Sequence, residues 1–287
     1  MGIKILFVAV FSPESTNTSQ ADSFEENSCE VIRFNYREVA ARMGDFNRDN
    51  LLIETCNKER PDVVVFSKCN EIHPQVVTEC NRYSKTVLWY MDPVNANWCP
   101  SLTEKMKRAT LVFCALTESY EKAKEIGGDK VYFLHEGYDQ ECNYPMDVEP
   151  KYDYSFIGNL REERLDYHKK FPFPVIQDAY AEKHSLAVSQ TKINLNFTQG
   201  GTSDRTYKVL ASRGFLLTEP WPEMEKDFTP GKDLVVFTNV EEMKEKIDYY
   251  LHNEEERAII ASRGHETNKK FSRLSWAKSI MNKIKVS

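Results

Sequence analysis

The stretch TKINLNFTQGGTSDRTYKVLASRGFLLT, residues 191–218, decides the fold of this chain. Its two apolar runs, KINLNF and GFLLT, predict strands, and the segment between them predicts a glycine-containing loop followed by a helix. Thr202, Ser203 or Asp204 can cap that helix, whose first amides have no partner within the helix. The stretch therefore predicts one strand–loop–helix–strand unit with an open helix start.

Two cations follow the loop at once, and they suggest a ligand. Arg205 and Lys208 lie in the first turns of the predicted helix. A helix start with nearby cations is a natural seat for a phosphate or a diphosphate. The alternative is an ordinary strand-to-helix crossover with a solvated cap, because most such loops bind nothing.

Outward from this stretch, short apolar runs alternate with longer amphipathic ones. The runs in the first half are IKILFVAV, CEVIRF, DVVVFS, KTVLWY, TLVFCA and KVYFLH. Their continuous apolar character fits a parallel sheet that is covered on both faces. Helical segments between them complete a β–α alternation, which predicts an α/β protein with doubly wound parallel sheets.

The segment from Glu136 to Tyr152, EGYDQECNYPMDVEPKY, breaks this rhythm. It contains two prolines and several turn-forming residues, and it predicts the connection between two domains. A second β–α alternation follows it. We therefore expect two Rossmann-like domains, residues 1–150 and 151–270, and a C-terminal helix over 271–287. A ligand would lie in the crevice facing the carboxyl ends of both sheets.

Composition agrees with an ordinary globular protein. The chain has 287 residues, of which 41% are hydrophobic and 29% are charged, so it is long enough for two domains. Its formal net charge of -6 argues against nonspecific adhesion to nucleic acid, although a local basic site remains compatible with it.

The cysteines and histidines indicate neither disulfides nor a metal. The seven cysteines are widely spaced without a CxxC pair, and Cys114 in LVFCAL reads as a core residue. The six histidines have no metal-site spacing. The N-terminal MGIKILFVAVF lacks the flanks of a signal peptide, and no apolar run reaches the roughly 20 residues that span a bilayer. We expect a cytoplasmic, reduced protein.

Several strings of the second half, taken in order, carry a family resemblance. They extend from Tyr152 to about Glu266 and read YDYSFIGNLREER, SQTKINLNF, DRTYKVLASRGFLLTE, FTPGKDLVVFTNVEEMKEKIDYYL and EEERAIIASRGHE. This set resembles the GT-B glycosyltransferases, in particular the CgeB-like, glycosyltransferase-family-1-type proteins of bacteria and phages. The first half resembles them more weakly, through HEGYDQECNYP and WYMDP.

The resemblance implies an activity and an organisation. It implies a UDP-linked sugar donor held mainly by the C-terminal domain, and an acceptor on the side of the N-terminal domain. It further implies sugar transfer to a hydroxyl without an essential metal and without a cofactor. Finally, it implies that the last helix crosses back to the N-terminal domain.

Residues after the strand YSFI are the first donor candidates. A side chain at Gly158 would obstruct the close approach of a ligand to the backbone. Asn159, Arg161 and Arg164 follow, and the resemblance implies a basic residue near Arg164 that faces the donor phosphates. A solvated helix face explains Arg161 and Arg164 equally well.

Arg205 is the stronger candidate. The resemblance implies an arginine here, two residues before an aromatic position that Tyr207 fills, and an arginine fork can grip two phosphate oxygens. With Lys208 it forms our candidate catalytic pair against the leaving diphosphate. Asn196, Thr202, Ser203 and Asp204 complete the predicted donor site.

Lys208 departs from the family pattern. Many GT-B enzymes carry a glutamate at this position that holds the donor ribose, and lysine cannot accept hydrogen bonds from ribose hydroxyls. Glu219, after the strand GFLLT, is one replacement. Otherwise the donor sits differently, or Lys208 adds a second cation against the diphosphate.

Acceptor candidates lie at the predicted carboxyl ends of the first sheet. Asp92 in WYMDP would be the general base of an inverting enzyme, would only bind substrate in a retaining one, or is simply a turn-forming Asp-Pro. The other acceptor candidates are Ser12 and Asn17 in the polar turn FSPESTNTSQ, Lys68 and Asn70 after DVVVFS, and His135 and Glu136 after the last strand.

Three functions remain open at this point. The first is a glycosyltransferase that acts on a saccharide, lipid-linked or small-molecule acceptor. The second is a phage-type transferase whose acceptor is a hydroxymethylated base in DNA, and steep salt dependence of duplex binding would favour it. The third, motivated by Lys208, is a noncatalytic protein that binds nucleotide sugars.

Overall fold

The computed structural model describes residues 2–12, 15–94, 98–161, 163–198 and 201–286. The chain forms two compact units. The first unit comprises Met1–Glu136 and Arg273–Ser287, and the second comprises Gly137–Ser272.

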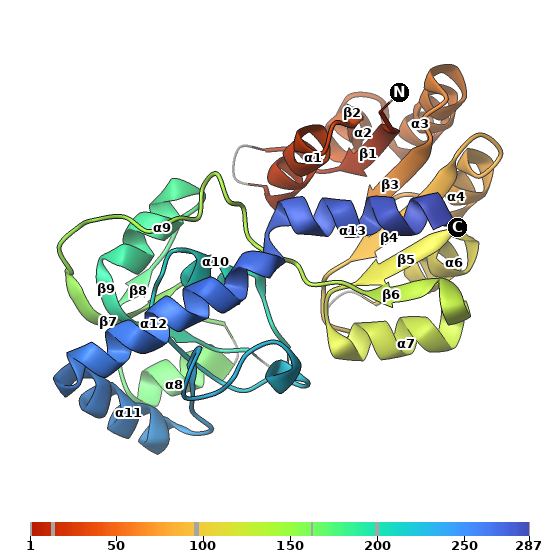
Figure 1. Ribbon diagram of the computed structural model, residues 1–287. Helices are drawn as coiled ribbons and strands as arrows, with labels where there is room; N and C mark the ends of the chain where they lie inside the picture. Colours follow the sequence, from red (N-terminus) through yellow and green to blue (C-terminus); the bar gives the residue numbers. More distant parts are fainter. Residues whose placement is uncertain (1, 13–14, 95–97, 162, 199–200, 287) are drawn as a thin grey trace. The chain divides into compact units, whose positions relative to one another are not determined.

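The first unit is built on a parallel sheet with the strand order β2-β1-β3-β4-β5-β6 (Figure 1). Every pairing between these strands is parallel, as the continuous apolar runs predict. The strands are β1 (Lys4–Ala9), β2 (Glu30–Asn35), β3 (Val63–Ser67), β4 (Lys85–Tyr90), β5 (Leu111–Cys114) and β6 (Val131–Phe133).

Helices cover both faces of this sheet, because successive side chains of a strand point to opposite faces. Leu6, Val8, Val64 and Phe66 belong to one core cluster, which also contains Cys114 as expected. Its helices are α2 (Tyr36–Met43), α3 (Asp45–Glu59), α4 (Pro74–Cys80), α6 (Pro100–Arg108) and α7 (Thr117–Gly127). The 3-10 turn η1 (Gly128–Lys130) follows α7, and Gly128 is the C-cap with φ +64°.

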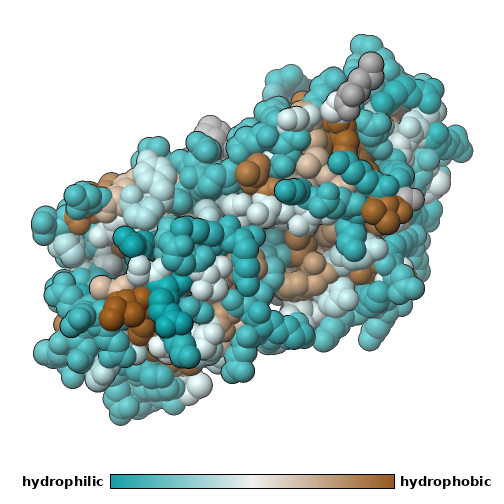
Figure 2. Space-filling model, viewed as in Figure 1, coloured by the Kyte–Doolittle hydropathy of each residue, from teal (hydrophilic) through white to brown (hydrophobic). Residues whose placement is uncertain are grey.

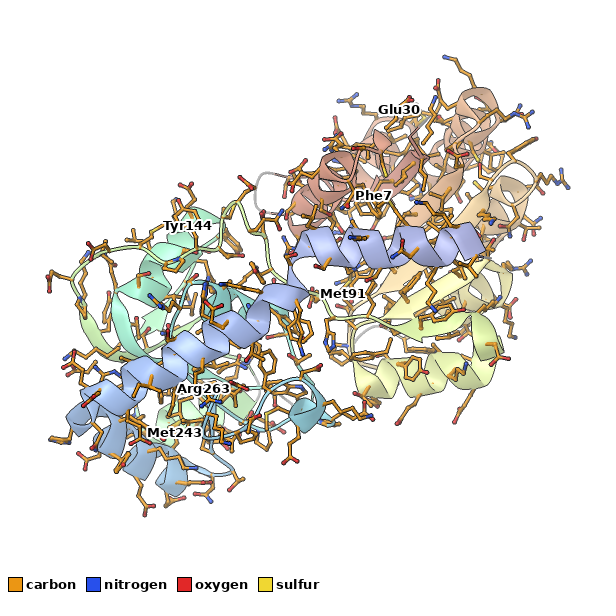
Figure 3. All side chains as sticks on the ribbon, in the orientation of Figure 1. Phe7, Glu30, Met91, Tyr144, Met243 and Arg263 are labelled. Carbon is orange, nitrogen blue, oxygen red and sulfur yellow. The ribbon has the colours of Figure 1, made fainter. Side chains whose placement is uncertain are left out.

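The opposite face is covered by α1 (Thr16–Glu26) and by the last helix, α13 (Arg273–Val286). Figure 1 shows α13 alongside this sheet, far in sequence from its neighbours. The ring of Trp276 lies 5.2 Å from that of Phe24 and 5.5 Å from that of Trp89. Phe7, labelled in Figure 3, packs edge-on against Phe24. The chain's last helix therefore completes the core of the first unit.

The second unit has its own parallel sheet, in the order β11-β10-β9-β7-β8. Its strands are β7 (Tyr152–Ile157), β8 (Val175–Ile176), β9 (Thr191–Asn196), β10 (Leu216–Thr218) and β11 (Val235–Val236). Both sheets together confirm the predicted α/β class with doubly wound parallel sheets.

Two helical layers enclose the second sheet. Side chains of α8 (Glu163–Lys170) and α11 (Val240–His252) pack with one core cluster, and those of α9 (Glu182–Ser189) and α10 (Asp204–Ala211) with the other. The remaining elements are α12 (Glu254–Asn268) and the 3-10 turns η2 (Met224–Lys226) and η3 (Lys269–Phe271).

The segment expected to connect the domains belongs to the second unit by its contacts. The Tyr138 amide donates to the Phe271 carbonyl at 3.1 Å, and the Ser185 hydroxyl donates to the Cys142 carbonyl at 2.8 Å. Tyr144, labelled in Figure 3, donates its hydroxyl to Glu182. The division between the units thus falls after Glu136, ahead of the prolines that mark the segment in the sequence.

The face shown in Figure 2 is mostly hydrophilic, with apolar residues in small separate patches. In the part of the chain that the structure describes, no helix has the length and apolar character needed to cross a membrane.

Candidate functional site

The strand–loop–helix–strand unit of residues 191–218 forms as predicted, from β9 through α10 to β10. Gly200, which we counted in the loop, lies outside the described residues. Ser203 is the N-cap residue of α10, but its hydroxyl makes no capping hydrogen bond, contrary to the expectation that a loop side chain caps this helix. Within the described residues, the buried hydroxyls of Thr202 and Ser203 have no hydrogen-bond partner. Two polar groups therefore stand unused at the start of α10.

Arg205, in the first turn of α10, is fixed against the ends of two strands. Its Nε donates to the Ile157 carbonyl at 2.6 Å, and its Nη1 donates to Asn196 Oδ1 at 3.0 Å. The guanidinium carbon lies 4.7 Å from the centre of the Phe156 ring, within cation–π range. These partners are neutral, so they orient the guanidinium and leave its charge in place.

Asn196 makes this arrangement rigid. Its side chain is fully buried at the end of β9, and its Nδ2 donates to Thr218 at 3.0 Å and to Thr206 at 3.3 Å. The amide thereby joins β9, β10 and α10 beneath Arg205. The structure gives Asn196 a role in holding the arginine, and its amide atoms are already occupied by protein groups.

Gly158 is required by the same arginine. Its φ of +140° is a backbone conformation that other residues rarely adopt. A Cβ atom here would lie 2.8 Å from Arg205 Nη2 and 3.2 Å from the Phe156 ring. The predicted close approach to this glycine is thus made by the arginine side chain.

A second arginine adds its charge at the same strand end. Arg164 of α8 is half-buried, lies 5.6 Å from the Phe156 ring, and donates to the Phe197 carbonyl at 3.4 Å. Burial, and then the nearby charge of Arg164, lower the pKa of Arg205 to about 10, so it remains charged at neutral pH. Asn159 and Arg161 are exposed. Two guanidinium groups thus lie against one ring at the carboxyl end of β7.

Lys208 lies one turn further along α10 and pairs with Asp204, at 2.5 Å between Nζ and Oδ2. Its charge is therefore balanced within the helix, which argues against a second free cation for the diphosphate. His184 of α9 lies in the field of this pair. Burial, followed by the charge of Lys208, lowers the pKa of His184 to about 3, so the ring is neutral. Among the described residues its Nδ1 has no hydrogen-bond partner.

From the sequence, His135 alone was singled out among the histidines, so the position of His184 in the field of Lys208 was not predicted. The chain separates it from Lys208 by a strand and a loop, and no motif marks it. Only the packing of α9 beside α10 brings the two side chains together.

Tyr207 and Glu219 are placed differently from the other donor candidates. Tyr207 is 1% exposed, and its ring packs in the core against Phe271 at 5.3 Å and Phe228 at 6.4 Å.

Glu219 accepts the Thr198 amide at 2.9 Å and faces the α8 side, where a cavity of about 300 Å³ also includes Tyr167. Burial and then Glu219 raise the pKa of Tyr167. Glu219 therefore holds the loop after β9 and lies away from the α9–α10 side of Lys208.

In the first unit, polar groups meet at the carboxyl ends of β1, β3 and β4. Lys68 Nζ lies 2.6 Å from Asp92 Oδ1, and the Ser67 hydroxyl donates to Asn17 Oδ1 at 2.7 Å. The Ser119 hydroxyl donates to the Asp92 carbonyl at 2.7 Å. The structure thus brings together three of the predicted acceptor residues, Asn17, Lys68 and Asp92.

The remaining acceptor candidates are Ser12, Asn70, His135 and Glu136, and each has surroundings of its own. Asn70 Oδ1 is buried and has no hydrogen-bond partner among the described residues. Ser12 is exposed, and its carbonyl accepts from the Ser15 amide. His135 packs edge-on against Phe133, and with Glu136 it ends the first segment of this unit.

All seven cysteines are free thiols. Over the described ranges, no group of three or more His, Cys, Asp and Glu side chains is arranged to hold a metal ion.

Two units that each carry a doubly wound parallel sheet are the fold of the GT-B glycosyltransferases, and solved structures of that class share it with this chain. Residues 143–281 match the family model described as "Glycosyl transferase-like". No curated protein matches the sequence.

Solved structures match nearly the whole chain at low identity. HepE of Anabaena, in complex with UDP-glucose, has a TM-score of 0.69 at 9% identity, over 99% of this chain and 100% of that one. A glycosyltransferase of Rickettsia africae has a TM-score of 0.66 at 11% identity, over 99% and 98%. Sucrose-phosphate synthase of Thermosynechococcus elongatus has 0.66 at 8% identity, over 99% and 98%. At these identities the matches establish the fold.

Proposed function

We propose that this glycosyltransferase moves a sugar from a UDP-linked donor to a hydroxyl group of a saccharide acceptor, without a divalent metal. The fixed guanidinium of Arg205 is the observation that carries the proposal. Structures of HepE with UDP, with UDP-glucose, and with UDP and glucose support the choice of nucleotide and of acceptor class.

The donor diphosphate is assigned to the start of α10. Arg205 and Arg164 supply two positive charges at the end of β7, and the hydroxyls of Thr202 and Ser203 supply hydrogen bonds. Preorganised cations of this kind stabilise the negative charge that grows on a leaving diphosphate. Because the two arginines supply this charge, the proposed reaction needs no divalent cation.

Asp92 is assigned to the acceptor. The acceptor oxygen forms a bond to the anomeric carbon while the bond from that carbon to the diphosphate oxygen breaks, and UDP departs. Asp92 takes the proton of the acceptor hydroxyl, as a general base. The neighbouring Asn17, Ser67 and Asn70 are neutral hydrogen-bonding groups, which suit a hydroxyl-rich and uncharged acceptor.

The first test is donor binding. UDP-glucose at about 100 times its dissociation constant should stabilise the protein by roughly 2.7 kcal/mol, which thermal melting detects readily. A panel of other nucleotide sugars serves as the comparison. If none of them shifts the melting temperature, the assignment of the donor is wrong.

The second test is turnover of Arg205→Ala with UDP-glucose as donor and glucose as acceptor. We expect a fall on the order of 100- to 1,000-fold, because one preorganised donor to the leaving group is lost. Arg263→Ala is the matched control, since Arg263 is exposed on α12 and labelled in Figure 3. Melting curves of both variants establish that they are folded. Near-normal transfer by folded Arg205→Ala would remove the central assignment.

A further inference from the structure

Lys105 of α6 is a lysine with a fully buried side chain in the first unit. Its Nζ donates to three main-chain carbonyls, those of Cys69 at 2.5 Å, Ile72 at 3.2 Å and Asn70 at 3.3 Å. An ammonium group has three N–H donors, so these carbonyls use its full capacity. Lys105 thus binds the loop between β3 and α4 from within the core.

A second buried cation binds the carbonyl of Glu71, which lies within this loop and accepts no hydrogen bond from Lys105. Arg48 of α3 is 1% exposed, and its Nη2 donates to the Glu71 carbonyl at 2.7 Å. The four consecutive carbonyls of residues 69–72 are therefore all held by two buried cations. Asp49, which pairs with Arg48, also accepts the His73 amide at 3.1 Å and closes the loop.

The loop needs such restraint because it begins in an unfavourable conformation. Lys68 and Cys69 have φ values of +57° and +54°, which place two successive non-glycine residues in the left-handed region. Such conformations persist only where the surroundings enforce them, and they concentrate at functional sites. Here they follow directly on β3, and the side chain of Lys68 reaches Asp92.

Lys105 is itself an unfavourable choice for a core position. Burial of an ammonium is costly, and it lowers the pKa of Lys105. An apolar side chain would fill the same space without this cost, but it would leave three carbonyls unsatisfied and the loop unrestrained. The contacts of the lysine therefore point to the loop as the reason for its presence.

We propose that Lys105 is a positioning residue, which acts through the 69–72 carbonyls to hold the Lys68 ammonium against Asp92. Its effect on catalysis rests on the proposed function, in which Asp92 receives the acceptor proton. The positioning itself does not depend on that function, so the two can be tested apart.

The first experiment measures the position of Lys68 without any substrate. The full chain is treated with a trace of acetic anhydride, and the acetylation rate of Lys68 is read by peptide mass spectrometry. In Lys105→Met the rate should rise roughly two- to fivefold, which matches the strength of a partly exposed ion pair. Lys105→Arg, which keeps a cation with several donors, should restore most of the protection.

Lys107→Met is the matched control, because Lys107 lies on the same helix with a side chain that is 53% exposed and paired with Glu104. The acetylation rate of Lys68 in the Lys107→Met variant should equal the rate in the wild type. If Lys105→Met does not fold, the rate is read in Lys105→Gln, which retains two N–H donors. An unchanged Lys68 rate in a folded Lys105 variant would overturn the proposal.

The second experiment measures transfer from UDP-glucose to glucose. We expect Lys105→Met to lower kcat on the order of 10- to 100-fold with the KM for UDP-glucose unchanged, because a displaced reacting group costs this much. In a Lys68→Met background, Lys105→Met should lower kcat by less than about a further threefold. The effects of two residues that act through one contact do not add, because the first substitution already removes that contact. Full additivity would show that Lys105 acts by another route.

The two experiments separate the two claims. A wild type that binds no nucleotide sugar and transfers no glucose contradicts the proposed function, while the Lys68 acetylation rates still decide the positioning role. Unchanged acetylation with normal wild-type transfer contradicts only the positioning role.

Discussion

The two units carry the same kind of parallel sheet, yet they arrange charge differently at the carboxyl ends of their strands. In the second unit, Arg205 is oriented by neutral oxygens and shares the Phe156 ring with Arg164. In the first unit, Lys68 is paired with Asp92. One scaffold thus gathers two guanidinium groups at a strand end, which suits a diphosphate, and the other a lysine–aspartate pair, which suits an uncharged acceptor. The difference lies in the loops, and it predicts that substitutions in each unit affect different substrates.

Asp92→Asn should have the largest effect and should act on the acceptor alone. Loss of a general base lowers turnover by roughly 100- to 10,000-fold. The affinity for UDP, measured by calorimetry, should not change, because the diphosphate is assigned to the second unit. A comparable loss of UDP affinity, or transfer at nearly the wild-type rate, would contradict this division of labour.

Trp276→Ala tests whether α13 belongs energetically to the first unit. Trp276 is 2% exposed and packs on Phe24 and Trp89, so its truncation should cost about 3–5 kcal/mol. Urea unfolding followed by hydrogen exchange should show this loss in residues 2–136 and not in β7 to β11. Lys278→Ala, an exposed change on the same helix, should stay within about 0.5 kcal/mol of the wild type. Equal destabilisation of both units would contradict the assignment.

Gly158→Ala should weaken the donor site of the second unit. The new Cβ would displace Arg205 Nη2, and the affinity for UDP should fall roughly 10- to 100-fold. Gly231→Ala is the control, because Gly231 also has a positive φ, of +76°, but nothing within 4 Å of its Cβ position. It shares the backbone strain without the clash. Equal UDP affinities in the two variants would mean that Gly158 does not serve Arg205.

His184→Gln should have the smallest effect, visible only as a change in pH dependence. The pKa of His184 is about 3 in the folded protein against 6.5 for the free side chain, so the unfolded chain binds the proton more readily between these values. Stability therefore falls as the pH falls below 6.5, by on the order of 1–2 kcal/mol between pH 7 and pH 5.

The variant should lose this component, which urea unfolding at the two pH values measures. His252→Gln is the control, since the side chain of His252 is 76% exposed. An acid dependence that is the same in wild type and His184→Gln would show that this ring is not held neutral by burial.

The strands and most helices of both units were predictable from the sequence, for a physical reason. Strands buried on both faces read as unbroken apolar runs, and β1 and β3 to β5 follow such runs closely. The place of Arg205 in the first turn of a helix was also predictable, since that helix follows a glycine-containing loop. The helix α2 was not predicted, because it has only eight residues and begins directly after β2 ends at Asn35.

The details of the candidate sites depended on tertiary contacts. Tyr207 was grouped with Arg205, yet residues two apart on a helix face different directions, and Tyr207 points into the core. Lys105 binds carbonyls 33 to 36 positions earlier in the chain, and no local pattern records that distance. The roles of the predicted donor and acceptor residues stay predictions until the variants are measured.

The use of α13 in the first unit has a consequence for biosynthesis. The ribosome completes β1 to β6 first, but the face that bears Phe7 and Trp89 has only α1 as its cover until Trp276 and Ile280 have left the exit tunnel. Until then the nascent sheet exposes an apolar surface of the kind that aggregates or recruits chaperones. The half of the protein that is translated first should therefore be the last to reach its native state.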